Sequence, residues 1–292
     1  MGNEGIVGCF LVPAEDGFLL IETGPESTLL TVKAAVGEAG FRLEQLRAIL
    51  VTHIHLDHAG AAGALAKETG AKVYVHERGY KHLHDPSRLL DSATRIYGDM
   101  MDTLWGSITP VPETQLVSLD GGETVKLFGR TIDTLYTPGH ASHHLAFLLD
   151  EGTLFTGDAA AIRLTGSSVI RPALPPPEIN LELLAESAEV MLAAKPKRLM
   201  LTHFGEVTDA QAHLQALPKR NQAWADEILL GMKAGETDEE LIERISSFGN
   251  AELAVDNAPE DVANRHRLTS NYEMTVSGVK RYWEKHHPEV VE

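Results

Sequence analysis

The chain has one cysteine, no excess of basic residues and no long apolar run. Cys9 has no partner for an intrachain disulfide, and one thiolate cannot anchor a metal cluster, so we predict a small buried hydrophobic residue. No window approaches the roughly 18 consecutive apolar residues of a membrane span, and the first residues lack a signal-peptide pattern. These absences predict a cytoplasmic protein with no membrane partner.

Negative charge dominates the composition. The 292 residues include 42 Asp and Glu against 25 Lys and Arg, a formal net charge of −17. Such a surface repels phosphate backbones and no local basic patch offsets it, so we expect no nucleic-acid partner. The 43% hydrophobic and 23% charged residues are typical of a globular protein. The length allows one large domain or two modest ones.

Short apolar runs alternate with helical patterns along the first two thirds of the chain. Residues 6–12 and 18–23 predict a hairpin, and residues 46–53 predict a strand buried on both faces. Residues 77–105 predict a helical insert between strands, and the pattern beyond Glu206 is helical and charged. The expected fold class is α/β, with two sheets and a C-terminal helical extension.

Histidine is the unusual residue, because several of its 14 copies are grouped. The segment VTHIHLDHAG follows a predicted strand and contains four metal-capable side chains: His53, His55, Asp57 and His58. Three further predicted strands end at such residues, namely His140, Asp158 and His203. Since the carboxyl ends of strands are where open α/β sheets place their sites, these seven side chains predict a metal centre.

Imidazole and carboxylate donors without thiolate suit zinc, manganese or iron. Seven ligands exceed the needs of one tetrahedral ion, so we predict two divalent ions that share Asp158. Zinc is the first choice, with iron and manganese as alternatives. A single H-x-H pattern arises by chance on many strands, but the whole set of strand-end donors favours a metal site.

The same residues resemble the motifs of the metallo-β-lactamase-fold hydrolases. THIHLDHAG matches their first metal motif, TPGHASHH the second, FTGDAA the third and the His of LTHF the last. The resemblance implies an αββα sandwich of two mixed β-sheets flanked by helices, with a catalytic domain over 1–205 and a helical extension over 206–292. It also implies two ligand sets bridged by Asp158: His53, His55 and His140 for one metal, and Asp57, His58 and His203 for the other.

Departures from the family pattern narrow the expected substrate. The IETG turn has Glu22 where the family often has Asp, and we expect it to support the metal ligands. His143 stands where Gly is common, whereas His144 matches a frequent family His. The segment LTHFGEV differs from the Cys-Gly-His-Glu-Tyr of glyoxalase II enzymes, which weakens a glutathione-thioester assignment. Asp158 in place of Cys argues against antibiotic hydrolysis.

We therefore predict a binuclear hydrolase of the glyoxalase II or lactonase-like branch, acting on a small ester, thioester or lactone. A metal-bridging hydroxide would attack the carbonyl, and Asp57 would bind metal, orient the nucleophile and pass a proton to the leaving group. One alternative is a mononuclear non-haem iron dioxygenase of the persulfide type. A phosphodiesterase is a second alternative, which the negative charge disfavours.

The remaining residues of interest have simpler expected roles. His76 is expected either to line the pocket or to be exposed. Solvated positions are expected for His82, His84, His213, His266, His286 and His287. Ordinary core packing is expected for the large side chains of the insert, with a lid over an acyl or ring-bearing substrate as the alternative: Tyr80, Tyr97, Met100, Met101 and Trp105. The expected partner is a small molecule, and the charged C-terminal helices are a candidate dimer contact.

Overall fold

The structure is a computed structural model that describes residues 4–203 and 205–291. These residues form two compact units. The first contains Val7–Tyr136 and His143–Gly157. The second contains residues 4–6, Thr137–Ser142 and the described part of 158–291. The division into a catalytic domain over 1–205 and an extension over 206–292 stays a prediction.

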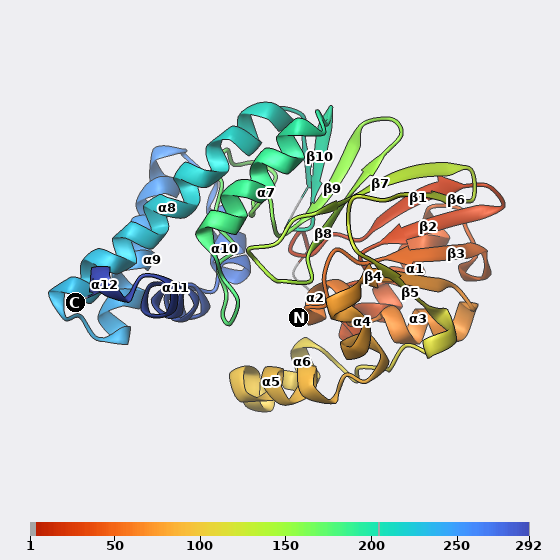
Figure 1. Ribbon diagram of the computed structural model, residues 1–292, viewed down its shortest axis with the longest axis horizontal. Coiled ribbons are helices and arrows are strands. Elements are labelled where there is room, and N and C mark those ends of the chain that lie inside the picture. The colour runs from red at the N-terminus through yellow and green to blue at the C-terminus, as the bar shows by residue number, and fades with distance from the viewer. Residues whose placement is uncertain (1–3, 204, 292) are drawn as a thin grey trace. The chain divides into compact units, whose positions relative to one another are not determined.

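The first sheet belongs entirely to the first unit and has the strand order β1-β2-β3-β4-β5 (Figure 1). The pair β1–β2 is antiparallel, whereas β2, β3, β4 and β5 are parallel to one another. The five strands are β1 (Phe10–Ala14), β2 (Gly17–Ile21), β3 (Leu46–Leu50), β4 (Lys72–His76) and β5 (Leu116–Leu119).

The predicted hairpin is confirmed, but its first strand begins later than expected. Phe10 pairs with Ile21, the last residue of β2. The next residue, Glu22, has a φ of 61° and so leaves the extended region of backbone space. Residues 4–9 therefore have no partner in β2, and the described strand begins at Phe10.

Helices of the first unit pack on the parallel strands and close a core around Ile49, Leu65 and Val73. Gly63 allows α3 to pack closely against the backbone at Thr109, because a Cβ on residue 63 would lie 1.8 Å from the Thr109 carbonyl oxygen. The α-helices are α1 (Leu29–Glu38), α2 (Leu56–Ala59), α3 (Ala62–Thr69), α4 (Glu77–His84), α5 (Ser87–Tyr97) and α6 (Met101–Leu104). Short 3₁₀ helices are η1 (Glu26–Thr28), η2 (Leu43–Gln45), η3 (Gly98–Met100) and η4 (Glu113–Gln115).

The second sheet has the strand order β11-β10-β9-β8-β7-β6. Antiparallel pairing joins β6 to β7, β7 to β8, β8 to β9 and β10 to β11. Within the first unit the two sheets face each other, as the rings of Phe10 and Phe155 show with centroids 5.1 Å apart. The six strands are β6 (Thr124–Leu127), β7 (Arg130–Tyr136), β8 (Leu145–Leu149), β9 (Thr153–Gly157), β10 (Arg198–Leu201) and β11 (Gly205–Val207).

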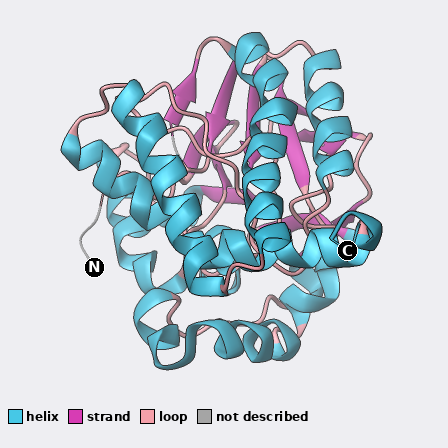
Figure 2. Cartoon of the chain, turned by 90° about the vertical axis from the view of Figure 1, so that its left-hand side faces the viewer, coloured by secondary structure: helices cyan, strands magenta, loops and turns pink. Residues whose placement is uncertain are grey.

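The C-terminal part of the second unit is helical, as predicted (helices are cyan in Figure 2). Its core surrounds Trp224, which is fully buried among Leu184, Ile245 and Val279. A capping box at Thr237 starts one of these helices, because its hydroxyl accepts from the Glu240 amide. The helices are α7 (Leu181–Ala193), α8 (Ala210–Ala234), α9 (Asp238–Val255), α10 (Glu260–Thr269), α11 (Tyr272–His286) and α12 (Pro288–Val291).

The predicted fold class, two mixed sheets flanked by helices with a helical C-terminal part, is confirmed. Two of the histidines expected to be solvated are not. His213 on α8 and His266 on α10 are both fully buried. The helical pattern did not reveal their burial, because it does not show which residues lie on the inner face of each helix. On that face, His213 Nε2 donates to the Ala160 carbonyl at 2.8 Å. Among the described helices, none has the length and apolar character needed to cross a membrane.

Candidate metal site

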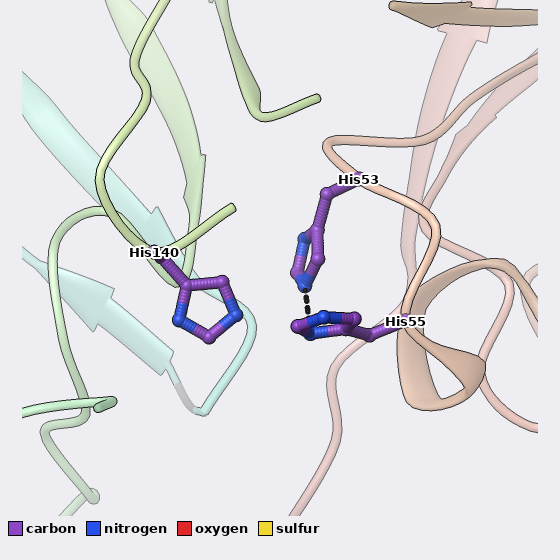
Figure 3. A group of neighbouring side chains, drawn as sticks. All are labelled: His53, His55 and His140. Carbon is purple, nitrogen blue, oxygen red and sulfur yellow. Dashed lines mark hydrogen bonds between the residues drawn. The ribbon is translucent and has the colours of Figure 1, made fainter. Parts of the chain in front are cut away.

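Four predicted ligands of the first unit lie on one short segment between β3 and α2. His53 follows the end of the strand, and His55 is the N-cap of the helix. Figure 3 shows His53 Nε2 pointing at His55 Nδ1, with 3.0 Å between the two nitrogens. Asp57 and His58 follow on the first turn of α2, where His58 Nε2 lies 3.6 Å from an Asp57 oxygen. The turn therefore gathers all four side chains, as the sequence predicts.

A single buried carboxylate, Glu22, aligns two of these imidazoles. Its Oε1 accepts a short hydrogen bond from the Thr52 hydroxyl and lies 3.3 Å from His58 Nδ1. Since the only proton of that hydroxyl goes to Glu22, His53 Nδ1 must donate to Thr52 Oγ1, 3.1 Å away. Both imidazoles thus have Nδ1 beside a protein oxygen, so Nε2 is the nitrogen that would bind a metal, in place of its present neighbours His55 and Asp57. Glu22 therefore contacts His58 directly and His53 through Thr52, which the sequence reasoning missed, and its support of metal ligands stays a prediction.

The predicted ligands of the second unit follow the same arrangement. The Nδ1–H of His140 donates to the Ala173 carbonyl at 3.0 Å, and that of His203 donates to the Ile6 carbonyl at 2.7 Å. The opposite nitrogens of these rings face Asp158, with Nε2 to carboxylate distances of 3.5 and 3.6 Å. Asp158 therefore faces one imidazole with each of its two oxygens, as a shared carboxylate would.

Among the described residues, three groups of side chains have the chemistry and the spacing to hold a metal ion. In each group, one ligand atom per residue lies within 4.8 Å of the others. The groups are His53, His55 and His140 (Figure 3); His53, His58 and Asp158; and Asp57, His58 and His203. All seven predicted donors occur in them, as imidazole nitrogens and carboxylate oxygens that suit a divalent ion. The residues present therefore fit the metals that the sequence predicts.

Other predicted residues lie around the first segment. His144 is fully buried and stacks on His53, with ring centroids 5.0 Å apart. Gly157 makes this stacking possible, because a Cβ there would lie 2.6 Å from His144 Nε2. His143 also lies beside His53, at 6.1 Å between centroids. His76 is buried rather than exposed, where it caps α4 and stacks on a tyrosine ring.

Several supporting groups escaped the sequence reasoning. Thr23 accompanies Glu22 and holds His58, because both its amide and its hydroxyl donate to the His58 carbonyl. The carbonyls of Ile6 and Ala173 are main-chain atoms, so no residue type in the sequence marks them as partners of His203 and His140. Thr52 had a signal, since it directly precedes the first ligand in VTHIH.

The single cysteine takes no part in ligation. Burial raises the pKa of Cys9 to about 12, and the Glu22 carboxylate adds to the effect. The side chain packs against the core of the first unit. Since only a thiolate binds metal or attacks a carbonyl readily, Cys9 acts as the small hydrophobic residue that the sequence predicts.

Comparison with known proteins gives a family match. A family model described as the metallo-beta-lactamase superfamily matches residues 2–203. The metallo-beta-lactamase fold-containing protein ST1585 of Sulfurisphaera tokodaii is 31% identical over 206 residues, which cover 69% of this chain and 77% of that protein. A hydroxyacylglutathione hydrolase of Aeromonas salmonicida is 29% identical over 149 residues, 51% of this chain and 44% of that protein.

Solved structures give a corresponding match. The metallo-beta-lactamase family protein TTHA1429 of Thermus thermophilus aligns with a TM-score of 0.71 at 21% identity, over 98% of this chain and 91% of that one. The protein TTHA1623, solved in a di-iron-bound form, aligns with a TM-score of 0.52 at 29% identity, over 72% of this chain and 93% of that one. The first of these supports the fold over nearly the whole length.

Proposed function

The chain belongs to the metallo-beta-lactamase superfamily, and we propose that it is a binuclear metal-dependent hydrolase of a small ester, thioester or lactone. One observation carries the proposal: four imidazoles have their Nδ1 atoms placed beside protein oxygens, an arrangement in which Nε2 would be the nitrogen that binds a metal. Glu22 and Thr52 do this for two of them, and main-chain carbonyls do it for His140 and His203. Such fixed tautomers are characteristic of ligands in a metal centre.

The seven donors divide into two sets that meet at one carboxylate. His53, His55 and His140 would hold one ion, and Asp57, His58 and His203 would hold the other. Asp158 would serve both, since its two oxygens face different imidazoles. Zinc is the first choice, and the di-iron form of TTHA1623 supports iron as the alternative. When bound, such ions would lower the pKa of a coordinated water to about 7 and would polarise the substrate carbonyl.

Asp57 has a second role in this proposal. Its side chain is 24% exposed, whereas that of its neighbour His58 is fully buried. A carboxylate at the open side of the site can orient the attacking water and accept its proton. The same group can then return the proton to the departing alkoxide or thiolate, which makes the leaving group neutral.

The substrate class rests on the donor set and on the relatives. An all-His/Asp set without cysteine agrees with the lactonase-like branch that the motifs resemble. A relative named as a hydroxyacylglutathione hydrolase supports hydrolysis of an acyl group. The net charge of −17 argues against a nucleic-acid phosphodiester.

The test combines metal analysis with a panel of substrates. Protein loaded with zinc or iron is assayed by elemental analysis and against lactones, thioesters, aryl esters and phosphodiesters. We expect two ions per chain and turnover of at least one carbonyl class. The His55→Ala variant should bind little metal at its site and lose nearly all hydrolysis, whereas His84→Ala, which removes an exposed imidazole, should retain both.

Two outcomes would contradict the proposal. Turnover confined to phosphodiesters would reassign the reaction. One iron per chain together with oxygen consumption on a persulfide would support a mononuclear dioxygenase instead.

A further inference from the structure

The helical insert between β4 and β5 uses only part of its apolar surface for the core. Tyr80 and Leu89 pack against the core cluster of the first unit, as ordinary packing predicts. Several further large side chains of α5 and of the segment after it are not members of that cluster (α5 and α6 in Figure 1). We call four of them the insert face: Ile96, Tyr97, Met100 and Trp105.

Two members of the insert face form a fixed aromatic pair. The rings of Tyr97 and Trp105 meet edge to face, with centroids 5.0 Å apart and planes at 71°. Apolar side chains lie open to solvent beside this pair in the sequence, because Ile96 is 44% and Met100 is 49% exposed. Aromatic and thioether groups of this kind form adaptable apolar surfaces.

Hydrogen bonds connect the aromatic pair to the ligand segment. The Ser27 amide donates to the Trp105 carbonyl at 3.2 Å, and the Ser27 hydroxyl donates to the Leu104 carbonyl at 2.7 Å. Thr23, four residues before Ser27, donates to the His58 carbonyl at 2.8 Å. Residues 23–27 therefore hold the end of the insert beside the turn that presents Asp57 and His58.

Electrostatics agree with this placement. Burial raises the pKa of Tyr97 to about 12, and the Asp57 carboxylate adds to the effect. The shift agrees with the hydrogen bonds above, which hold the end of the insert beside the segment that carries Asp57.

The indole of Trp105 is costly for folding as it stands. Its Nε1 is buried, and no described residue accepts a hydrogen bond from it. A phenylalanine would fill similar space without an unpaired donor, so stability alone does not explain this tryptophan. A binding role for its large ring explains it better.

We propose that the insert face binds the apolar acyl chain of the substrate and selects medium-length acyl groups over acetyl. The inference rests on the proposed hydrolase function and names its substrate class. The scissile carbonyl would lie at Asp57, and the chain would extend along the two rings toward Ile96 and Met100.

The kinetic test compares two thioesters of one small thiol, acetyl- and octanoyl-N-acetylcysteamine, on metal-loaded protein. For Met100→Ala and Tyr97→Ala we expect the octanoyl-to-acetyl ratio of kcat/KM to fall about 10-fold or more, the usual worth of lost contacts in an apolar pocket. Tyr97→Phe keeps the ring and should restore the ratio. Leu30→Ala is the matched control, because it removes an apolar side chain that is 80% exposed on α1.

A binding measurement makes the test independent of turnover. By calorimetry, octanoate should bind the metal-loaded wild type at least 10-fold tighter than acetate, and Met100→Ala should reduce that difference below threefold. Trp105→Phe provides a variant expected to fold, because it removes the unpaired donor, and it should alter the octanoate affinity.

The two proposals fail in different ways. If octanoate and acetate bind equally and none of the variants changes the kcat/KM ratio, the insert face has no role in selection, although hydrolysis by the wild type would still support the proposed function. If the wild type hydrolyses no ester, thioester or lactone, the proposed function fails, and a preference for octanoate that the variants abolish would still show that the face binds acyl chains.

Discussion

Glu22 combines a buried carboxylate with a left-handed backbone conformation, and each of these features costs stability. Its carboxylate is fully buried, and its backbone has a φ of 61°, which costs energy for a residue with a Cβ. The conformation directs one oxygen to both Thr52 and His58. A strained and buried acid therefore stands where it contacts Thr52 and His58, beside two of the proposed metal ligands.

Glu22→Gln should lower metal affinity about 10 to 100-fold, the usual effect of changing a partner of a ligating histidine. The amide has the size of the acid but lacks its charge, so it polarises Thr52 and His58 less. Competition with a chelating dye measures the dissociation constants. Glu38→Gln, an exposed position on α1, is the control. An affinity within twofold of the wild type would show that Glu22 does not act through the ligands.

His266 predicts a pH dependence of stability. Burial lowers its pKa to about 4, Arg171 and Arg265 add to the effect and Asp256 opposes it. No described residue makes a hydrogen bond to either of its ring nitrogens. The folded state therefore favours neutral His266, and stability is complete above the unfolded pKa of about 6.5 and declines as the pH falls toward 4.

The expected loss is up to about 3 kcal/mol of unfolding free energy between pH 7 and pH 4. Urea unfolding of metal-free protein at several pH values measures it. His266→Leu should show a smaller decline than the wild type, and His84→Leu should match the wild type. Identical declines in all three proteins would mean that His266 does not titrate on unfolding.

The side chains that come together could be predicted from sequence, because imidazoles and carboxylates at strand ends are the donors that a divalent ion needs. Their orientation could not. The Ile6 and Ala173 carbonyls that place His203 and His140 are main-chain atoms, so nothing in the side-chain pattern marks them. Burial of His213 was also missed, because a histidine in a polar helical segment has the same appearance on either face.

At the scale of elements, the small residues after the ligand segment determine how closely α3 can pack. A Cβ on Gly63 would lie 1.8 Å from the Thr109 carbonyl oxygen and 2.7 Å from its carbon. Backbone cannot move aside as a flexible side chain can. The glycine is therefore required by packing rather than by an unusual φ.

Two glycine-to-alanine substitutions in helices should change the stability of the protein in opposite directions. Gly37→Ala on α1 meets nothing within 4 Å and should stabilise the protein by about 0.5–1 kcal/mol, through helix propensity. Gly63→Ala should destabilise it by about 1–3 kcal/mol or more, because the helix must shift. Chemical unfolding of both variants measures the difference. A Gly63→Ala protein as stable as Gly37→Ala would contradict the close contact.

The positions of the helices and strands were predicted better than the roles of their side chains. Alternation of apolar runs with helical patterns identified the sheets and the C-terminal helices, because burial of one face imposes that periodicity. Helical periodicity also identified the insert. It could not separate Tyr80, which packs on the core, from Tyr97, since both positions have the same residue type and similar surroundings in sequence.

At the scale of the whole molecule, the proposed ions take their ligands from four separate segments of the chain. A metal ion that binds only the folded state stabilises the protein by about 2.7 kcal/mol when its concentration is 100 times its dissociation constant. Removing the metals should therefore lower the melting temperature by roughly 5–10 °C. Calorimetry before and after chelation measures this, and added zinc should reverse it. An unchanged melting temperature after complete metal removal would contradict a structural contribution of the ions.

The hydrogen bond from His203 to the Ile6 carbonyl makes one proposed metal ligand depend on a residue almost 200 positions away in the chain. A protease that cuts just after Ile6 would remove the carbonyl that accepts the hydrogen bond of His203, but it would remove none of the proposed metal-binding side chains. The clipped protein would keep every metal-binding side chain, yet the His203 ring could rotate and present the wrong nitrogen. Loss of activity during storage should therefore be checked first by mass spectrometry of the amino-terminal peptide.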